Sequence, residues 1–132
     1  MQKVTILCVG KLKEKFYMDA AAEYAKRLSR FCRLEIAELA EERLPEDPSQ
    51  AQIDRALAAE AARITERLPK GGALIALCIE GTELSSPALA ERLRTMTVSG
   101  ASELTFLIGG SVGLDRSLKA RADLRLSMSP MT

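Results

Sequence analysis

Residues 104–114 read LTFLIGGSVGL, an unbroken apolar or β-branched run that leads into three closely spaced glycines. A short apolar run bounded by glycine predicts a buried strand, residues 104–108, that feeds a tight loop. A strand without polar alternation is typical of a parallel sheet with helices on both faces. Ligands of such sheets bind at the carboxyl ends of the strands, where glycine permits positive φ and close approach to the backbone. The glycine loop, residues 109–113, is therefore the first candidate site.

Size and charge limit what the chain can be. It has 132 residues, 47% of them hydrophobic, which predicts one domain, residues 1–132, with its own core. The formal net charge is only +1, so no overall basic field predicts nucleic-acid binding. Residues 11–33 nevertheless carry seven basic and three acidic side chains. Lys11, Lys13 and Lys15 follow the first predicted strand and could either meet a polyanion or form a solvated turn.

Cysteine usage and hydropathy indicate in which cellular compartment the protein resides. Cys8, Cys32 and Cys78 lie far apart without a C-x-x-C pair, which predicts reduced core thiols and neither a disulfide frame nor a metal site. No stretch approaches the roughly 18 apolar residues of a membrane span, and the amino terminus lacks a signal-peptide pattern. We expect a soluble, cytoplasmic protein that binds no metal and no membrane.

Strands and helices are predicted to alternate along the chain. Apolar runs predict further strands at residues 4–9, 73–79 and 124–126. Residues 34–39, where glutamates alternate with Leu34, Ile36 and Leu39, predict a shorter and half-exposed strand. Apolar residues at intervals of three and four predict helices at residues 17–31, 53–68, 86–100 and 117–122, with the stripe of the first on the core. This alternation predicts an α/β fold with a mostly parallel sheet and helices on both faces.

Local signals predict where some elements begin and end. Glu80 and Gly81 are expected to end the third strand, as the glycines do after Ile108. Ser86, followed by Pro87, is expected to cap the third helix, because proline is suited to a first helical position. Residues 40–50 hold four acids and two prolines, which predicts a connecting loop.

Three chemistries can be fitted to the glycine loop. Residues 109–113 match G-x-S-x-G, the nucleophile elbow of hydrolases, but the chain has no histidine to activate Ser111. We expect that serine to hydrogen-bond its own loop. A phosphate-binding P-loop would need a Lys-Ser or Lys-Thr pair, and Asp115-Arg116 stands there instead. The remaining option is a cofactor that is read by backbone groups.

A family resemblance favours this last option. The segments ILCVGKLKEKFYMDAAAEYAKRL, ALIALCIEGTELSS and FLIGGSVGLDRSLKARADLRLSMSPMT occur in order along the chain. Together they resemble the ribosomal RNA large subunit methyltransferase H family, small SPOUT-class enzymes that methylate N3 of a pseudouridine in 23S rRNA. The resemblance implies a trefoil-knotted α/β domain that acts as a homodimer on the assembled ribosome and uses S-adenosylmethionine.

The resemblance also implies which residues bind the cofactor. The matching positions lie in the third strand, the glycine loop and the terminal segment: Leu77, Gly109, Met128, Ser129, Pro130, Met131 and Thr132. It assigns no catalytic residue within residues 1–132. Glu80 and Asp115 are the only carboxylates near strand ends that could be tested as a base, and a solvated loop position explains each of them better.

Members of the family continue past the position of Thr132 with a further helix that threads the knot and supplies active-site residues. We therefore expect the chain that ends at Thr132 to be catalytically silent. The alternative function is a non-catalytic nucleotide- or RNA-binding α/β module.

Overall fold

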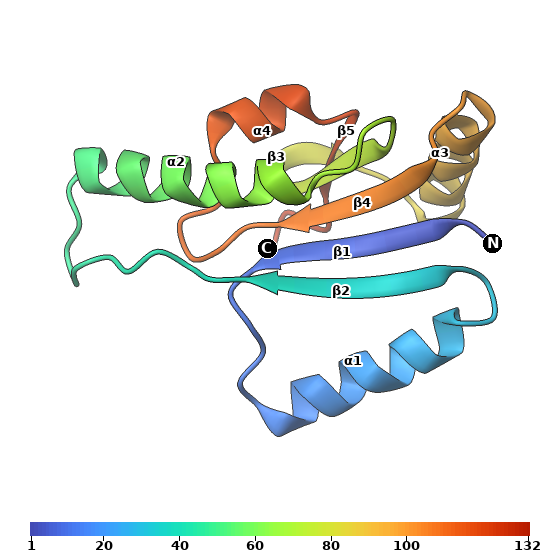
Figure 1. The fold of residues 1–132 in the computed structure, drawn as a ribbon, viewed down its shortest axis with the longest axis horizontal. Helices are drawn as coiled ribbons and strands as arrows, with labels where there is room; N and C mark the ends of the chain where they lie inside the picture. The colour runs from blue at the N-terminus through green and yellow to red at the C-terminus, as the bar shows by residue number, and fades with distance from the viewer.

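The structure is a computed structural model that describes residues 1–132. Strands and helices alternate from end to end (Figure 1). The elements are β1 (Lys3–Val9), α1 (Lys15–Leu28), β2 (Arg33–Leu39), α2 (Gln50–Arg67), β3 (Ala73–Glu83), α3 (Ser86–Val98), β4 (Glu103–Ile108), α4 (Arg116–Arg121) and β5 (Leu124–Ser127). None of the helices is long and apolar enough to cross a lipid bilayer.

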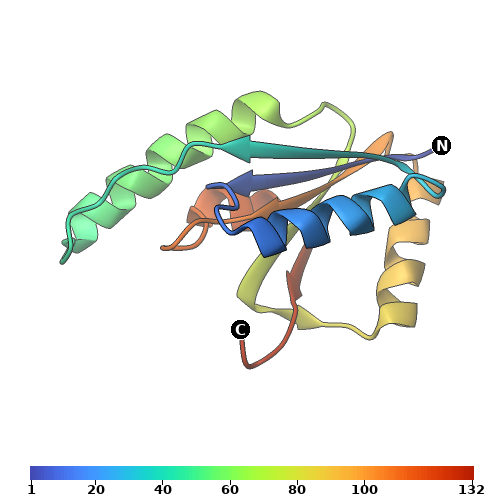
Figure 2. The same ribbon diagram turned by 90° about the horizontal axis from the view of Figure 1, so that it is seen from below.

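The five strands form one parallel sheet in the order β2-β1-β4-β3-β5. This confirms the α/β fold and the parallel sheet. All carboxyl ends of the strands therefore lie at one edge, because every neighbouring pair is parallel. Figure 2 shows α1 and α3 on one side of the sheet and α2 on the other.

One face of the sheet is closed by α2 and α4. Ile64 of α2 and Leu118 of α4 share a buried core with Leu7, Ala76 and Leu107 of three strands, each at most 2% exposed. A capping box between Ser49 and Gln52 opens α2, which explains why this helix begins at Gln50. The apolar stripe predicted for α2 is confirmed, since Ala61 and Leu68 also pack on this core.

The opposite face is covered less completely. Leu89, Leu93 and Met96 of α3 pack against a second core of buried residues that includes Ile75 and Leu104. Beyond α3 the same face leaves Ile36 45% exposed and Ile108 38% exposed. Apolar side chains of the sheet thus remain in contact with solvent on this side.

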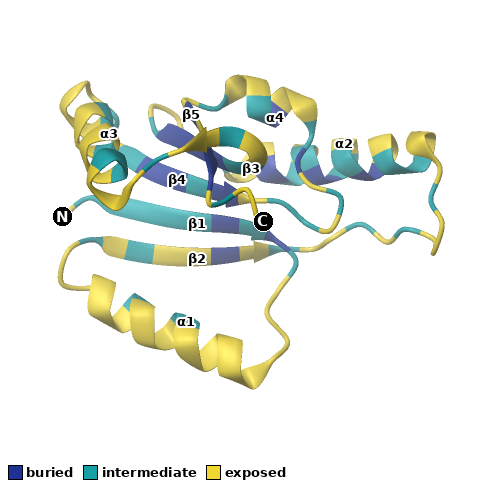
Figure 3. Ribbon diagram, turned by 180° about the vertical axis from the view of Figure 1, so that it is seen from behind, coloured by how far each residue is buried: buried dark blue, intermediate teal, exposed yellow.

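Helix α1 was expected to bury its apolar stripe, and that prediction is wrong. It has no buried residue, and its exposed side chains include Tyr17, Tyr24 and Leu28; Phe31, just past its end, is exposed too (Figure 3). Only small residues such as Ala21 are half-buried. The 3.6-residue period marks an apolar face correctly but does not say which surface covers it.

Strand β3 runs four residues past Ile79 instead of ending at Glu80 and Gly81. Its pairing with β5 shifts register between Leu77 and Thr82. A Cβ at Gly81 would lie 2.8 Å from backbone atoms of Arg125 and Leu126, so the two chains touch at this glycine. Gly81 therefore marks an irregularity within the strand and not its end, a common role of glycine in sheets.

Two smaller predictions also need correction. The side chain of Ser85, not that of Ser86, caps α3 by accepting a hydrogen bond from Ala88 N at 3.2 Å. The three cysteines are free thiols and half-buried, outside the two buried cores. Burial is the main cause that raises the pKa of Cys8 and Cys78.

Candidate functional site

A cavity of about 520 Å³ lies at the carboxyl edge of the sheet. It is bounded by the ends of β3, β4 and β5, by the glycine loop, by α4 and by the terminal segment. Its lining includes Leu77, Ile108, Gly109, Leu126, Met128 and Thr132. Parallel α/β sheets place their ligands at this edge, and the volume lies within the usual range of small-molecule sites.

The glycine loop lines this cavity as a tight turn. Gly113 N donates to Gly110 O at 3.1 Å, and Gly113 has a φ of +87°, which an L side chain rarely adopts. Gly109 does not have a positive φ, so the expectation that glycine permits positive φ does not apply at this position. A Cβ at Gly109 would instead lie 2.5 Å from Gly113 O. Glycine at position 109 is therefore required by the return of the loop's own backbone.

Ser111 bonds a different part of the chain from the one expected. Its Oγ donates to Glu41 Oε1 at 2.7 Å, and its backbone N donates to the same oxygen at 2.9 Å. Glu41 lies in the connection between β2 and α2, so the prediction that Ser111 bonds its own loop is wrong. Glu41 was missed because nothing in its acidic loop sequence distinguishes it from Glu42 or Glu46.

The terminal segment contributes part of the cavity wall. Met128 and Thr132 line the cavity, whereas Ser129, Pro130 and Met131 do not. Ser129 organises the chain end, since its Oγ accepts from Met131 N at 3.0 Å and its backbone O accepts from Thr132 N at 3.1 Å. Met131 is 95% exposed. The structure thus brings Leu77, Gly109, Met128 and Thr132 together.

The two carboxylates considered as bases are both engaged. Lys119 Nζ donates to Glu80 at 2.6 Å, and this bond is the largest cause that lowers the pKa of Glu80. Asp115 caps α4 by accepting from Ser117 N at 2.9 Å, and the bonds from Ser117 lower the pKa of Asp115. Lowered pKa values make both groups weaker bases near neutral pH.

Lys119 also lines the cavity, although no pattern in the sequence distinguished it as a site residue. It stands one residue after buried Leu118 on α4, and its side chain is 28% exposed.

No group of three or more His, Cys, Asp or Glu side chains is arranged to hold a metal ion.

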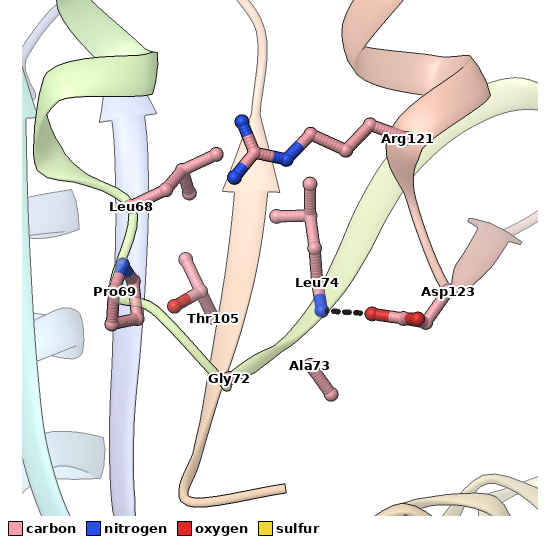
Figure 4. Close-up of a pocket in the computed structure, with 8 residues that line it drawn as sticks. All are labelled: Leu68, Pro69, Gly72, Ala73, Leu74, Thr105, Arg121 and Asp123. Carbon is pink, nitrogen blue, oxygen red and sulfur yellow. Dashed lines mark hydrogen bonds between the residues drawn. The ribbon is translucent and has the colours of Figure 1, made fainter.

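A second, smaller cavity of about 220 Å³ lies near the start of β3 and β4, at the opposite edge of the sheet from the glycine loop. Figure 4 shows Arg121 extending over it, and Asp123 accepting from Leu74 N at 2.8 Å. The Oγ1 of Thr105, which also lines it, is buried without a hydrogen-bond partner. Ligands of parallel sheets bind at the other edge, so we assign no function to this cavity.

Comparison with known proteins shows which family has this arrangement. Residues 2–132 match the family model described as "Predicted SPOUT methyltransferase". The ribosomal RNA large subunit methyltransferase H of Streptococcus equi subsp. zooepidemicus is 47% identical over 130 residues, which cover 98% of this chain and 82% of that protein. The proteins of the same name from Streptococcus pyogenes and Acetivibrio thermocellus are 45% and 43% identical, with the same coverage. The chain therefore belongs to the SPOUT family of methyltransferases.

Proposed function

We propose that this protein transfers a methyl group from S-adenosylmethionine to N3 of a pseudouridine in 23S rRNA of the large ribosomal subunit. The observation that carries the proposal is the cavity formed jointly by the glycine loop, β3 and the terminal segment. The printed name of the similar Streptococcus equi protein, a large subunit rRNA methyltransferase, gives the substrate class.

The residues around the cavity suit the proposed cofactor. Leu77, Ile108 and Leu126 provide apolar walls for an adenine ring, while the backbone of residues 109–113 offers polar groups without side-chain charge. We propose that Leu77, Gly109 and the segment Met128, Ser129, Pro130, Met131 and Thr132 hold the cofactor. When bound, S-adenosylmethionine would supply a methyl group on a positively charged sulfur.

The role of the chain in such a transfer is mainly to position the reactants. In-line displacement depends on holding donor and acceptor in a close and aligned geometry. The N3 atom also carries a proton that must leave, and Glu80 and Asp115 have their pKa lowered by their partners. We therefore assign orientation and exclusion of water to the cavity residues and assign no catalytic base.

The exposed apolar surface supports a homodimer. Phe16, Tyr17, Tyr24 and Phe31 on and beside α1 are each more than half exposed, and Ile36 of the adjacent strand is 45% exposed. Several large apolar side chains exposed on one helix and its neighbouring strand favour a protein interface. We propose that a second copy of this chain covers it. The proposal further includes residues 1–132 as one cytoplasmic domain of the SPOUT type, whose trefoil knot is completed by the family's further helix. It also includes recognition of 23S rRNA in the assembled ribosome.

Transfer of a radioactive methyl group from S-adenosylmethionine to purified large ribosomal subunits tests the function. In the protein extended by the family's further helix, we expect label in 23S rRNA, at a pseudouridine identified by mass spectrometry of nuclease fragments. We expect none with Leu77→Asp in that protein, because the substitution places a charge in the cavity wall. Arg55→Ala, on the exposed side of α2, is the matched control. Binding of S-adenosylhomocysteine without any transfer would instead support a non-catalytic module, and label in another RNA would contradict the assigned substrate.

A further inference from the structure

The connection between β2 and α2 is fixed to α2 although it has no regular structure. Arg63 Nη1 donates to Ala40 O at 3.0 Å, and the same guanidinium pairs with the Glu42 carboxylate. Glu42 N donates to Glu60 Oε2 at 2.8 Å, and Glu60 is only 3% exposed. The residues on either side of Glu41 are therefore held in place by two side chains of α2, the buried Glu60 and the partly exposed Arg63.

From this fixed segment Glu41 reaches the glycine loop. One of its oxygens, Oε1, accepts both hydrogen bonds from Ser111, at 2.9 Å from N and 2.7 Å from Oγ. These bonds are the largest causes that lower the pKa of Glu41, so the carboxylate is ionised at neutral pH. Hydrogen bonds to an ionised acceptor are stronger than those between neutral groups.

The glycine next to Ser111 makes this approach possible. A Cβ at Gly110 would lie 2.8 Å from Glu41 Oε1 and 3.2 Å from Val9 Cγ1. Gly110 therefore leaves the space that the carboxylate occupies. Glu41 thus holds the turn from Gly110 to Gly113 at Ser111, and all four residues of the turn line the cavity.

We propose that Glu41 is a positioning residue that fixes the Gly110–Gly113 turn in the shape required to bind S-adenosylmethionine. This inference rests on the proposed function. Glu41 does not itself line the cavity, so it acts through Ser111. The turn has few other anchors, since Ser111 and Gly113 are exposed and the return bond from Gly113 N lies within the turn.

The first measurement compares S-adenosylhomocysteine binding by calorimetry in the wild-type protein, Glu41→Ala, Glu41→Gln and Ser111→Ala. We expect Glu41→Ala to weaken binding on the order of tenfold, as expected for loss of charge-assisted hydrogen bonds near the surface. Glu41→Gln should lose less, because its amide oxygen can still accept. The double variant with Ser111→Ala should lose less than the sum of the single effects, because both act through one contact.

Glu46→Ala is the matched control, since Glu46 lies in the same connection, is exposed and makes no hydrogen bond or ion pair. Its binding should equal that of the wild type. In Glu41→Ala, hydrogen exchange at the Ser111 amide should accelerate while the melting temperature stays close to that of the control. In the protein extended by the family's further helix, Glu41→Ala should raise KM for S-adenosylmethionine with ribosomal substrate and change kcat little.

The outcomes separate the two proposals. Wild-type protein that does not bind S-adenosylhomocysteine would overturn the proposed cofactor. Wild-type binding with equal affinity in Glu41→Ala would overturn the role of Glu41 alone. A fall in melting temperature with unchanged affinity and unchanged Ser111 exchange would show that Glu41 only stabilises the fold, which also contradicts the inference.

Discussion

Lys119 Nζ lies 2.6 Å from Glu80 Oε1 and joins α4 to the irregular part of β3 at the rim of the cavity. Both residues line the cavity, so this ion pair links two of its walls. Because Glu80 is 57% exposed, the pair should contribute less than about 1 kcal/mol to stability.

We predict that Lys119→Met raises the pKa of Glu80 toward its ordinary value near 4.5, because the largest cause of the lowered pKa is lost. A group with a lowered pKa stabilises the fold above its ordinary pKa and loses this effect as the pH falls through the lowered value. The variant should therefore lose part of its stability above about pH 4.5 and match the wild type at strongly acid pH. NMR titration of side-chain carboxyl carbons measures the pKa of Glu80, and denaturant unfolding at several pH values measures the stability.

Arg94→Met is the control for this titration. Arg94 pairs with Glu91 on α3, away from the cavity, and lowers the pKa of Glu91. The control should shift Glu91 and leave Glu80 unchanged. An unchanged Glu80 titration in Lys119→Met would show that the 2.6 Å contact does not persist in solution.

Gly109→Val should abolish S-adenosylhomocysteine binding, and Gly109→Ala should already weaken it by roughly tenfold or more. The reason is the 2.5 Å approach of the added Cβ to Gly113 O, which forces the turn out of the cavity wall. Gly100→Ala is the control, because Gly100 has a φ of +109° with nothing within 4 Å of the added Cβ. It should cost about 1 to 3 kcal/mol of stability without changing affinity. Normal binding by a folded Gly109→Ala protein would remove Gly109 from the proposed site.

Replacing Lys11, Lys13 and Lys15 by Gln should weaken binding to ribosomal particles and reduce its dependence on salt. These exposed residues follow β1 at the carboxyl edge of the sheet, the edge that carries the cavity. Each lost phosphate contact should lower the magnitude of the log–log salt slope by about 0.7 to 0.9. The same change at Lys26, Arg27 and Arg30, at the other end of α1, is the charge-matched control. Equal slopes for the triple variant and the wild type would assign these lysines to a solvated turn.

Tyr24→Glu should convert the proposed dimer to monomers in analytical ultracentrifugation. Tyr24 is 61% exposed within the apolar surface of α1, and a charge there would be desolvated by a partner. Thr95→Glu, on the exposed side of α3, should leave the oligomeric state unchanged. A wild-type protein that stays monomeric at micromolar concentration would contradict the homodimer.

Local sequence patterns were sufficient to predict most of the strands and helices of the fold. Apolar runs and, in β2, apolar residues interleaved with glutamates predicted all five strands, and the stripe of α2 predicted its packing through Ile64. The exposed stripe of α1 was misread, because a periodic pattern looks the same whether the protein's own sheet or another surface covers it. The continuation of β3 through Gly81 depends on β5, a strand about forty residues later, and no local signal at Gly81 carries that information.

The candidate site likewise has parts that local sequence predicts and parts that depend on distant segments. The glycine loop was recognisable because its residues are contiguous and their conformational role is local. Glu41 was not, since it is 70 positions from Ser111 and meets it only through the fold. The buried Glu60 likewise lies on the otherwise apolar face of α2. Its partner, the backbone amide Glu42 N, is brought to it only by the fold.

The order of the strands also affects how this chain is made. β1 pairs with β4, in a register that matches Lys3 with Glu103, and Gln2 Nε2 donates to Ser102 O at 3.2 Å. At synthesis rates of roughly 5 to 20 residues per second, β1 waits on the order of 5 to 20 seconds for this neighbour. During that interval one edge of an apolar strand has no hydrogen-bonding partner, so the nascent chain can pair wrongly there. Refolding of the finished chain should likewise be slow for its size, because the sheet closes only when its first and fourth strands meet.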